Sequence, residues 1–195
     1  MKFYESGDSS KPVIFLFPGT CCLYSSFDHI LDGLHSYFYT VTVSYDGFDP
    51  NEKTEFYSME DECEKIEQEI KKKYDGRIKA AYGCSLGGSF VSLLIQRKRI
   101  HIDHGIIGSS DMDEAGHLVA KIKSSMVVPF MYKMIHTGAL PKFMQKKLNK
   151  TDEVKKELYN GFLNMFGIGK GGNPWITKQS IYNQFYSDLV TKVQH

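Results

Sequence analysis

The sequence predicts a single α/β domain, built on a mostly parallel sheet flanked by helices, with a helical C-terminal half. Three observations predict this class: four short β-type runs lie in the first 110 residues, the segments between them have helical periodicity, and no strand-like run follows them. The length of 195 residues, with 42% hydrophobic and 24% charged residues, suits one folded domain rather than two domains or a disordered chain.

The first predicted strand is the continuous apolar run at residues 13–17 (VIFLF), which is typical of a strand buried on both faces of a parallel sheet. Runs at 38–44, 78–82 and 105–108 predict three more strands. The spacings between these runs leave room for helices. This alternation of strand and helix predicts an α/β sheet.

The segments between the strands have the pattern of amphipathic helices. Residues 25–34 and 86–97 predict two of them, and the second is richer in apolar residues and therefore expected to be more buried. A third is predicted as a surface helix with Glu–Lys pairs four residues apart on its exposed side. Its apolar face is formed by Met59, Cys63, Ile66, Ile70 and Tyr74.

The sequence after residue 110 predicts only helices. Two of them are expected to begin at Thr151, as N-cap, and at Asn173, with Pro174 as the first helical residue. The glycine-rich segment 167–172 between them lacks the spacing of a phosphate-binding loop and is interpreted as a linker. Another helix is predicted from a four-residue apolar step that crosses Pro129, at Leu118, Ile122, Met126, Phe130 and Met134.

The motif that carries chemistry is the G-x-S-x-G segment from Gly83 to Gly87, between the third strand and its helix. A sharp turn from strand to helix would bring flanking side chains into collision, and the two glycines relieve this. Such a turn places the Ser85 hydroxyl at the carboxyl edge of the sheet, where the N-terminal N–H groups of the helix stabilise an oxyanion. The alternative is a glycine-rich turn with an idle serine.

Through Gly83 to Gly87, and through Phe17-Pro18-Gly19-Thr20 at the end of the first strand, the sequence resembles the α/β-hydrolase superfamily over about residues 11–110. The resemblance implies that Ser85 is the nucleophile and that the N–H groups of Thr20 and Leu86 form the oxyanion hole. It also implies a sheet core at 1–112 and a helical cap at 113–190 within one domain, 1–195. Pro18 stands where histidine is commoner in that family.

The resemblance further implies hydrolysis of an ester or related acyl bond in a small, largely apolar substrate, with no metal or organic cofactor. The acid of a catalytic triad is expected at the carboxyl end of the fourth strand, where Asp111 can reach the pocket. Asp111 and Asp113 are equally well placed to cap the next helix. Asp188 is a further possible pocket residue.

No catalytic histidine is assigned. His101 and His104 flank the start of the fourth strand, at the wrong edge of the sheet, and His117 and His136 fall in predicted helices. His195 is the last residue, where chains commonly fray. The two C-terminal strands of the family, which precede its histidine loop, are not visible, so we expect the final part of the sheet to be absent.

Because no base is assigned, two alternatives stay open. One is a catalytically incomplete hydrolase-like scaffold that binds an apolar ligand or a partner protein. The other retains the enzyme and takes its base from another chain or from an unusual residue such as His117. An incomplete sheet would also have an exposed edge, so a homodimer formed through that edge is a possible partner arrangement.

The composition and the sequence pattern also indicate which other classes of partner, and which location, are expected. The formal net charge of +1 gives no general reason to expect nucleic acid or an anionic membrane as partner. No signal-like or bilayer-spanning run is found, which favours a cytoplasmic location. The cysteines are expected to be free thiols rather than zinc ligands, with Cys84 buried and inert. The basic cluster Lys142, Lys146, Lys147 and Lys150 is interpreted as a solvated helix face.

Overall fold

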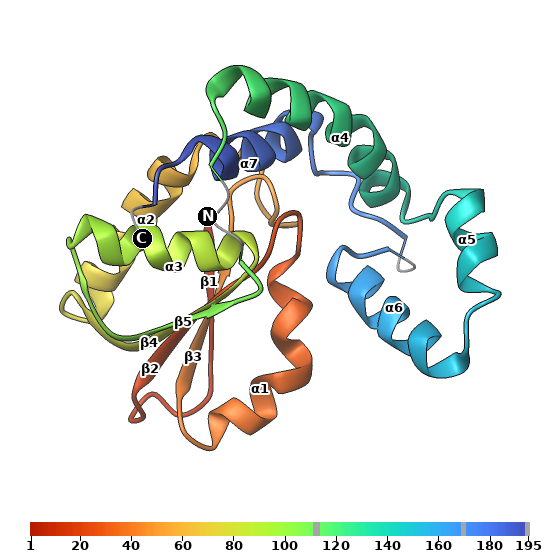
Figure 1. The fold of residues 1–195 in the computed structure, drawn as a ribbon. Helices are drawn as coiled ribbons and strands as arrows, with labels where there is room; N and C mark the ends of the chain where they lie inside the picture. The colour runs from red at the N-terminus through yellow and green to blue at the C-terminus, as the bar shows by residue number, and fades with distance from the viewer. Residues whose placement is uncertain (111–113, 169–170, 194–195) are drawn as a thin grey trace.

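The computed structural model describes residues 1–110, 114–168 and 171–193. Its centre is a five-stranded sheet in the order β1-β3-β2-β4-β5 (Figure 1). β1 is antiparallel to β3, whereas the other pairs are parallel, which confirms the prediction of a mostly parallel sheet. The strands are β1 (Lys2–Ser6), β2 (Val13–Phe17), β3 (Tyr39–Ser44), β4 (Arg77–Cys84) and β5 (His101–Gly108).

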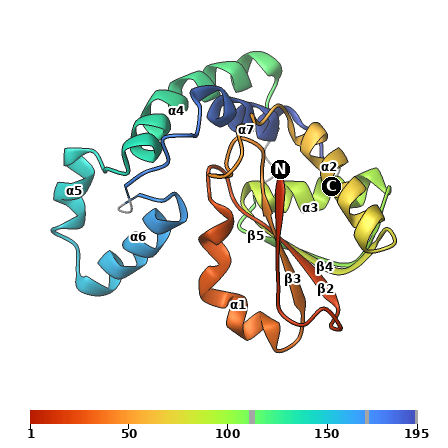
Figure 2. The same ribbon diagram turned by 180° about the vertical axis from the view of Figure 1, so that it is seen from behind.

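Helices cover both faces of this sheet (Figures 1 and 2). α1 (Asp28–His35), which follows a 3-10 turn at Tyr24–Phe27, packs on one face, where Ile14 and Leu16 of β2 are buried. α2 (Met59–Lys73) and α3 (Leu86–Arg97) cover the other face. Because successive side chains of a strand point to opposite faces, β2 is buried on both, as its continuous apolar run predicts.

The largest core lies between the sheet and the pair α2 and α3. The Phe90 ring of α3 is stacked on Tyr45 and on Phe17, at centroid distances of 4.8 and 6.4 Å, and it meets Phe56 edge-on. All four side chains are fully or almost fully buried. Since Phe90 lies on the second turn of α3, these contacts anchor the N-terminal end of that helix to the carboxyl ends of β2 and β3.

The rest of the described chain is helical: α4 (His117–Thr137), α5 (Lys142–Leu148), α6 (Glu153–Met165) and α7 (Lys178–Val190). α7 packs along α4 and lies between α4 and the sheet (Figures 1 and 2). It is fixed to the loop after β3, because the Phe56 N–H donates to Ser180 Oγ (3.2 Å) and Asn183 Nδ2 donates to the Phe56 carbonyl (2.7 Å).

Two predicted helix starts are wrong. α6 begins after Asp152, whose Oδ1 accepts from the Lys155 N–H (3.0 Å), rather than after Thr151. α7 begins after Thr177, whose hydroxyl caps the Ser180 N–H (3.0 Å). Asn173 instead closes the preceding loop, because its buried Nδ2 donates to the Phe166 carbonyl (2.8 Å).

The strands also differ from the prediction at two places. β1 is missing from it, because KFYES is short and has charged residues at two of its five positions. β5 begins at His101 rather than at 105, so it includes His101 and His104. Among the described residues β5 pairs only with β4, which leaves its other edge open.

Candidate active site

The chain turns sharply at Ser85, between β4 and α3. Its backbone has φ 53° and ψ −122°, a combination that residues with a side chain rarely adopt. The Ser85 N–H donates to the carbonyl of Gly108 at the end of β5 (2.8 Å), and the residue is exposed. The turn therefore presents the serine hydroxyl at the carboxyl edge of the sheet, and neighbouring structure maintains the strained backbone.

Gly83 and Gly87 are sterically required at this turn. A Cβ atom on Gly83 would lie 1.9 Å from the carbonyl oxygen of Gly87, and one on Gly87 would lie 2.0 Å from the carbonyl oxygen of Phe17. Both obstructing atoms are backbone, so no side chain can move to relieve the clash. The spacing of the two glycines around Ser85 thus follows from the close approach of β4, α3 and the end of β2.

The turn after β2 lies against Ser85. A Cβ on Gly19 would be 3.2 Å from the Cys84 carbonyl oxygen and 3.5 Å from Ser85 Cβ. The next residue, Thr20, is half-buried. Leu86 is the first residue of α3, so its N–H has no partner within the helix, and the positive end of the helix dipole lies at the same place. The N–H groups of Thr20 and Leu86 thus belong to the two segments that flank Ser85.

The turn after β2 is also anchored by residues that the sequence does not identify. The Tyr45 hydroxyl donates to the Pro18 carbonyl (3.2 Å), and the Cys21 N–H donates to Gln184 Oε1 (2.8 Å). Cys21 has a positive φ of 60°. Gln184 lies on α7 and is fully buried, and its Nε2 has no partner among the described residues. No local signal marks this contact, because Cys21 and Gln184 are 163 positions apart.

The acid predicted at Asp111, and its neighbour Asp113, lie outside the described residues. Asp188 is half-buried in the last turn of α7. A triad acid therefore remains a prediction.

The described histidines lie away from the turn. His101 pairs with Arg77, so it lies at the start of β5, whereas Ser85 follows the end of the parallel β4. The expectation of the wrong edge is therefore confirmed for His101, whereas His104 lies in the middle of β5, opposite Ala80. The exposed His117 makes a hydrogen bond to the Tyr186 hydroxyl (2.9 Å), and the His136 ring lies 4.9 Å from that of Tyr132. Within the described residues no histidine is hydrogen-bonded to Ser85.

All four cysteines are free, as predicted. Burial raises the pKa of the Cys21 thiol, and it raises that of Cys22 to about 12, so these neighbours of Thr20 are apolar thiols at neutral pH. The prediction that Cys84 is buried is wrong, because it is half-buried where β4 ends and α3 turns away.

A charged cluster lies at a different place, after β3. Asp46, Asp61 and Glu62 bring their carboxylates together, and Lys65 Nζ lies among them, 3.0 Å from Glu62 Oε1. Asp46 also pairs with the amino group of Met1. Burial, followed by the charge of Asp46, raises the pKa of Glu62 to about 7. Because ammonium groups already compensate these carboxylates, the cluster is an internal ion network.

Two surface pockets of about 670 and 590 Å³ lie elsewhere. The first pocket is lined by residues of the segment between β3 and α2, together with Trp175 and Thr177. The second is lined by residues between the end of α4 and Ile168, which include Gln145 of α5 and Asn160 of α6. Ser85 lines neither of them. The candidate site is therefore defined by the turn geometry at Ser85 and by the two segments that flank it.

Comparison with protein-family profiles and with curated protein sequences finds no match. Solved structures do match. An α/β hydrolase family protein from Desulfitobacterium hafniense has a TM-score of 0.71 at 15% identity, with 97% of this chain and 72% of that chain covered.

Two further structures give the same result. A carboxylesterase of Nitrososphaera gargenis has a TM-score of 0.68 at 14% identity, covering 98% of this chain and 68% of the other. The enol-lactonase from Burkholderia xenovorans LB400 has a TM-score of 0.65 at 12% identity, covering 98% and 70%. Together with the order and direction of the strands, these likenesses show that the chain has the α/β-hydrolase fold.

Proposed function

We propose that the protein is a serine hydrolase that cleaves an ester or a related acyl bond in a small, largely apolar substrate. Ser85 Oγ gives up its proton and attacks the acyl carbonyl, and the N–H groups of Thr20 and Leu86 stabilise the oxyanion that forms. The bond from the acyl carbon to the leaving oxygen then breaks, the leaving group takes up a proton, and water hydrolyses the acyl-serine. No base for these proton transfers is assigned among the described residues. The observation that carries the proposal is the strained, exposed backbone of Ser85 at the N-terminal end of α3. A strained residue of this kind persists where the surrounding structure over-determines it, commonly at active sites.

The surroundings of Ser85 support an acyl carbonyl as the reacting group. Cys21 and Cys22, which follow Thr20, are buried and uncharged, so these two side chains add no charge next to the proposed N–H donor of Thr20. Fixed backbone N–H groups of this kind stabilise an oxyanion without having to reorganise. The proposed reaction uses no metal or organic cofactor.

Gln184 is proposed as a positioning residue of this site. Its Oε1 accepts a hydrogen bond from the Cys21 N–H, which belongs to the peptide unit that joins Thr20 to Cys21. The bond leaves the Cys21 N–H occupied, so the donor assigned to the oxyanion on this turn is that of Thr20. Gln184 also ties α7 to the active-site turn, which links the helical part of the chain to the sheet.

A second candidate function is a catalytically incomplete scaffold that binds an apolar ligand or a partner protein. The observation that favours it is the lack, among the described residues, of a histidine bonded to Ser85. A serine hydroxyl without a base is a weak nucleophile. The two candidates differ in one measurable property, the reactivity of Ser85.

Labelling with a fluorophosphonate tests this property. We expect the folded protein to take up one label, which Ser85→Ala abolishes. The matched control is Ser109→Ala, because Ser109 is also exposed, has a positive φ of 51° and directly follows the neighbouring strand β5. If Ser85→Ala still takes up the label, the reactive nucleophile is another residue. If the folded wild-type protein takes up no label, the hydrolase proposal is wrong and the scaffold function is favoured.

A further inference from the structure

α4 has large apolar residues on its exposed side as well as on its covered side. Its buried residues are Ala120, Ser124, Val128, Met134 and Ile135. On the outside a stripe with a four-residue step is exposed: Leu118 (72%), Ile122 (53%), Met126 (75%) and Phe130 (41%). A helix with apolar residues all round is normally buried. The exposed stripe, named here the α4 stripe, is therefore expected to have a partner.

The α4 stripe faces away from the rest of the molecule. At about 100° per residue, its centre lies opposite the side formed by Ala120, Ser124 and Val128. Figures 1 and 2 show α4 at the edge of the molecule, with α7 between it and the sheet. An outward, convex face of this kind is accessible to a broad surface.

The charged side chains of Asp, Glu, Lys and Arg type on α4 itself all have one sign. α4 has no aspartate or glutamate, whereas Lys121, Lys123 and Lys133 are exposed. By the same helical geometry, Lys121 and Lys123 lie on opposite sides of the stripe, and Lys133 lies in line with its centre near the C-terminal end. Long lysine side chains in these positions place their ammonium groups beside the apolar residues.

The net charge of the whole chain conceals this distribution. Residues 1–113 contain 12 lysines and arginines and 18 acidic residues, whereas residues 114–195 contain 12 lysines and 5 acidic residues. The expectation of no membrane partner, which rests on the overall charge of +1, does not take this division into account. The helical half is strongly basic, and α4 combines that charge with exposed apolar residues.

We infer that the α4 stripe binds the surface of an anionic lipid membrane, with α4 lying in the plane of the interface. An apolar stripe between lysines is the pattern of interfacial helices, whose apolar side chains enter the acyl boundary while the lysines meet anionic headgroups. A second copy on this face would place no acidic residue of α4 opposite these lysines, so the charge of α4 favours an anionic surface as the occupant. None of the helices in the described ranges is long and apolar enough to cross a membrane.

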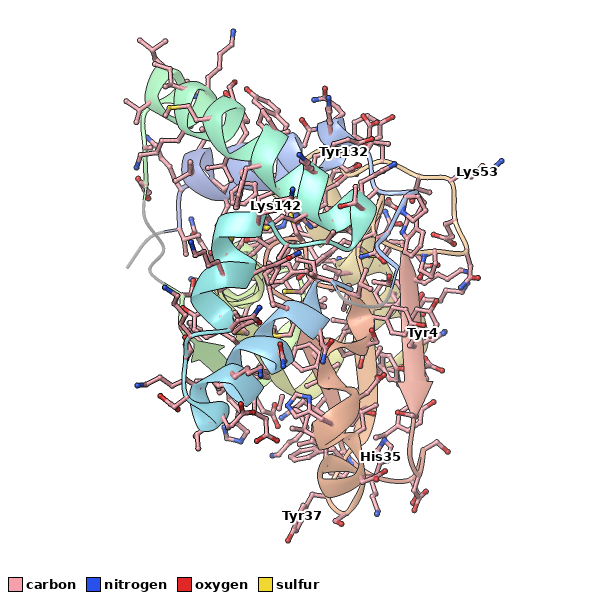
Figure 3. The ribbon with its side chains drawn as sticks, turned by 90° about the vertical axis from the view of Figure 1, so that its right-hand side faces the viewer. Tyr4, His35, Tyr37, Lys53, Tyr132 and Lys142 are labelled. Carbon is pink, nitrogen blue, oxygen red and sulfur yellow. The ribbon has the colours of Figure 1, made fainter. Side chains whose placement is uncertain are left out.

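Vesicle flotation of the full chain tests this inference. We expect binding to vesicles of phosphatidylcholine with phosphatidylserine, little binding to phosphatidylcholine alone, and loss of binding as salt is raised. Met126→Glu and Leu118→Glu are each expected to lower the partition coefficient roughly tenfold or more, and Lys123→Gln about fivefold. The control is Tyr37→Ser, since Tyr37 is 73% exposed and lies at the other end of the molecule from α4 (Figure 3).

Three results would overturn the inference. The folded protein could fail to bind anionic vesicles at low salt. It could bind them equally well after Met126→Glu and Leu118→Glu. It could also form a dimer, by light scattering, that Met126→Glu converts to monomer, in which case a second copy covers the α4 stripe. None of these measurements depends on the reactivity of Ser85.

Discussion

The sheet half and the helical half of the molecule are built by different means. In the sheet half, buried strands and backbone contacts fix the turn at Ser85 so closely that two glycines cannot be replaced without a clash. In the helical half, α4 and α6 expose large apolar residues, and α7 is tied to the sheet by the side chains of Ser180, Asn183 and Gln184. The comparison indicates a turn fixed by backbone contacts beneath a helical layer that is attached by a shared apolar core and by a few hydrogen bonds.

Gly87→Ala is the change expected to have the largest effect. Its Cβ would lie 2.0 Å from a backbone oxygen, so we expect loss of about 4 kcal/mol or more in the free energy of unfolding, or no folded protein. Gly161→Ala in α6 is the matched change in the helical half, where a Cβ meets nothing within 4 Å. Gly161→Ala is expected to raise the free energy of unfolding by up to about 1 kcal/mol. Chemical denaturation measures this free energy for both variants, and an equal loss in Gly87→Ala and Gly161→Ala would contradict the difference between the two halves.

Gln184→Met tests the link between the halves. Loss of the acceptor leaves the buried Cys21 N–H without a partner, which is expected to lower the free energy of unfolding by about 1–3 kcal/mol. It also removes the hydrogen bond that holds the turn containing Thr20. We expect the rate of fluorophosphonate labelling at Ser85 to fall about tenfold. Asn183→Ala, which removes the neighbouring bond from α7 to Phe56, is expected to reduce stability while leaving the labelling rate within about twofold. Equal labelling by both variants would contradict the positioning role.

Glu62→Gln tests the ion network of the sheet half. The folded-state pKa of Glu62, about 7, lies above its ordinary value of 4.5, because the carboxyl is buried and faces Asp46. The protonated folded form is therefore favoured at low pH, and this stabilisation is lost as the pH rises through about 7. Between pH 5 and pH 8 we expect the free energy of unfolding of the wild type to fall by about 1–3 kcal/mol more than that of Glu62→Gln. Chemical denaturation at each pH measures this, and an equal change with pH in the two proteins would contradict the prediction.

Leu158→Gln is the change expected to have the smallest effect. Leu158 is 76% exposed on α6, so its replacement should alter the free energy of unfolding by less than about 0.5 kcal/mol. Ile181→Ala, at a fully buried position of α7, is expected to cost about 2–5 kcal/mol. A large loss for Leu158→Gln in thermal or chemical unfolding would show that the exposed apolar residues of the helical half are covered in solution.

Much of the sheet half could be predicted, because its signals are local. β2 is a continuous apolar run, and the turn at Ser85 needs glycines at fixed positions. The helical half was less predictable. The start of α7 depends on Thr177 rather than on Pro174, and the Gln184 contact joins distant parts of the chain. The four-residue step of the α4 stripe predicts a shared face, but periodicity alone does not say whether that face is covered.

The most direct test of the central claim is to detect an acyl group on Ser85. The nitrophenolate of p-nitrophenyl butyrate is a good leaving group that departs without a proton, so we expect the ester to place one butyryl group per chain on Ser85, and acid quenching during the incubation traps it before hydrolysis. Intact-protein mass spectrometry with peptide mapping is expected to find this group on Ser85 in the wild type and in Ser109→Ala. A folded protein that remains unmodified, or that is acylated only on a lysine or on Cys84, would contradict the proposed role of Ser85.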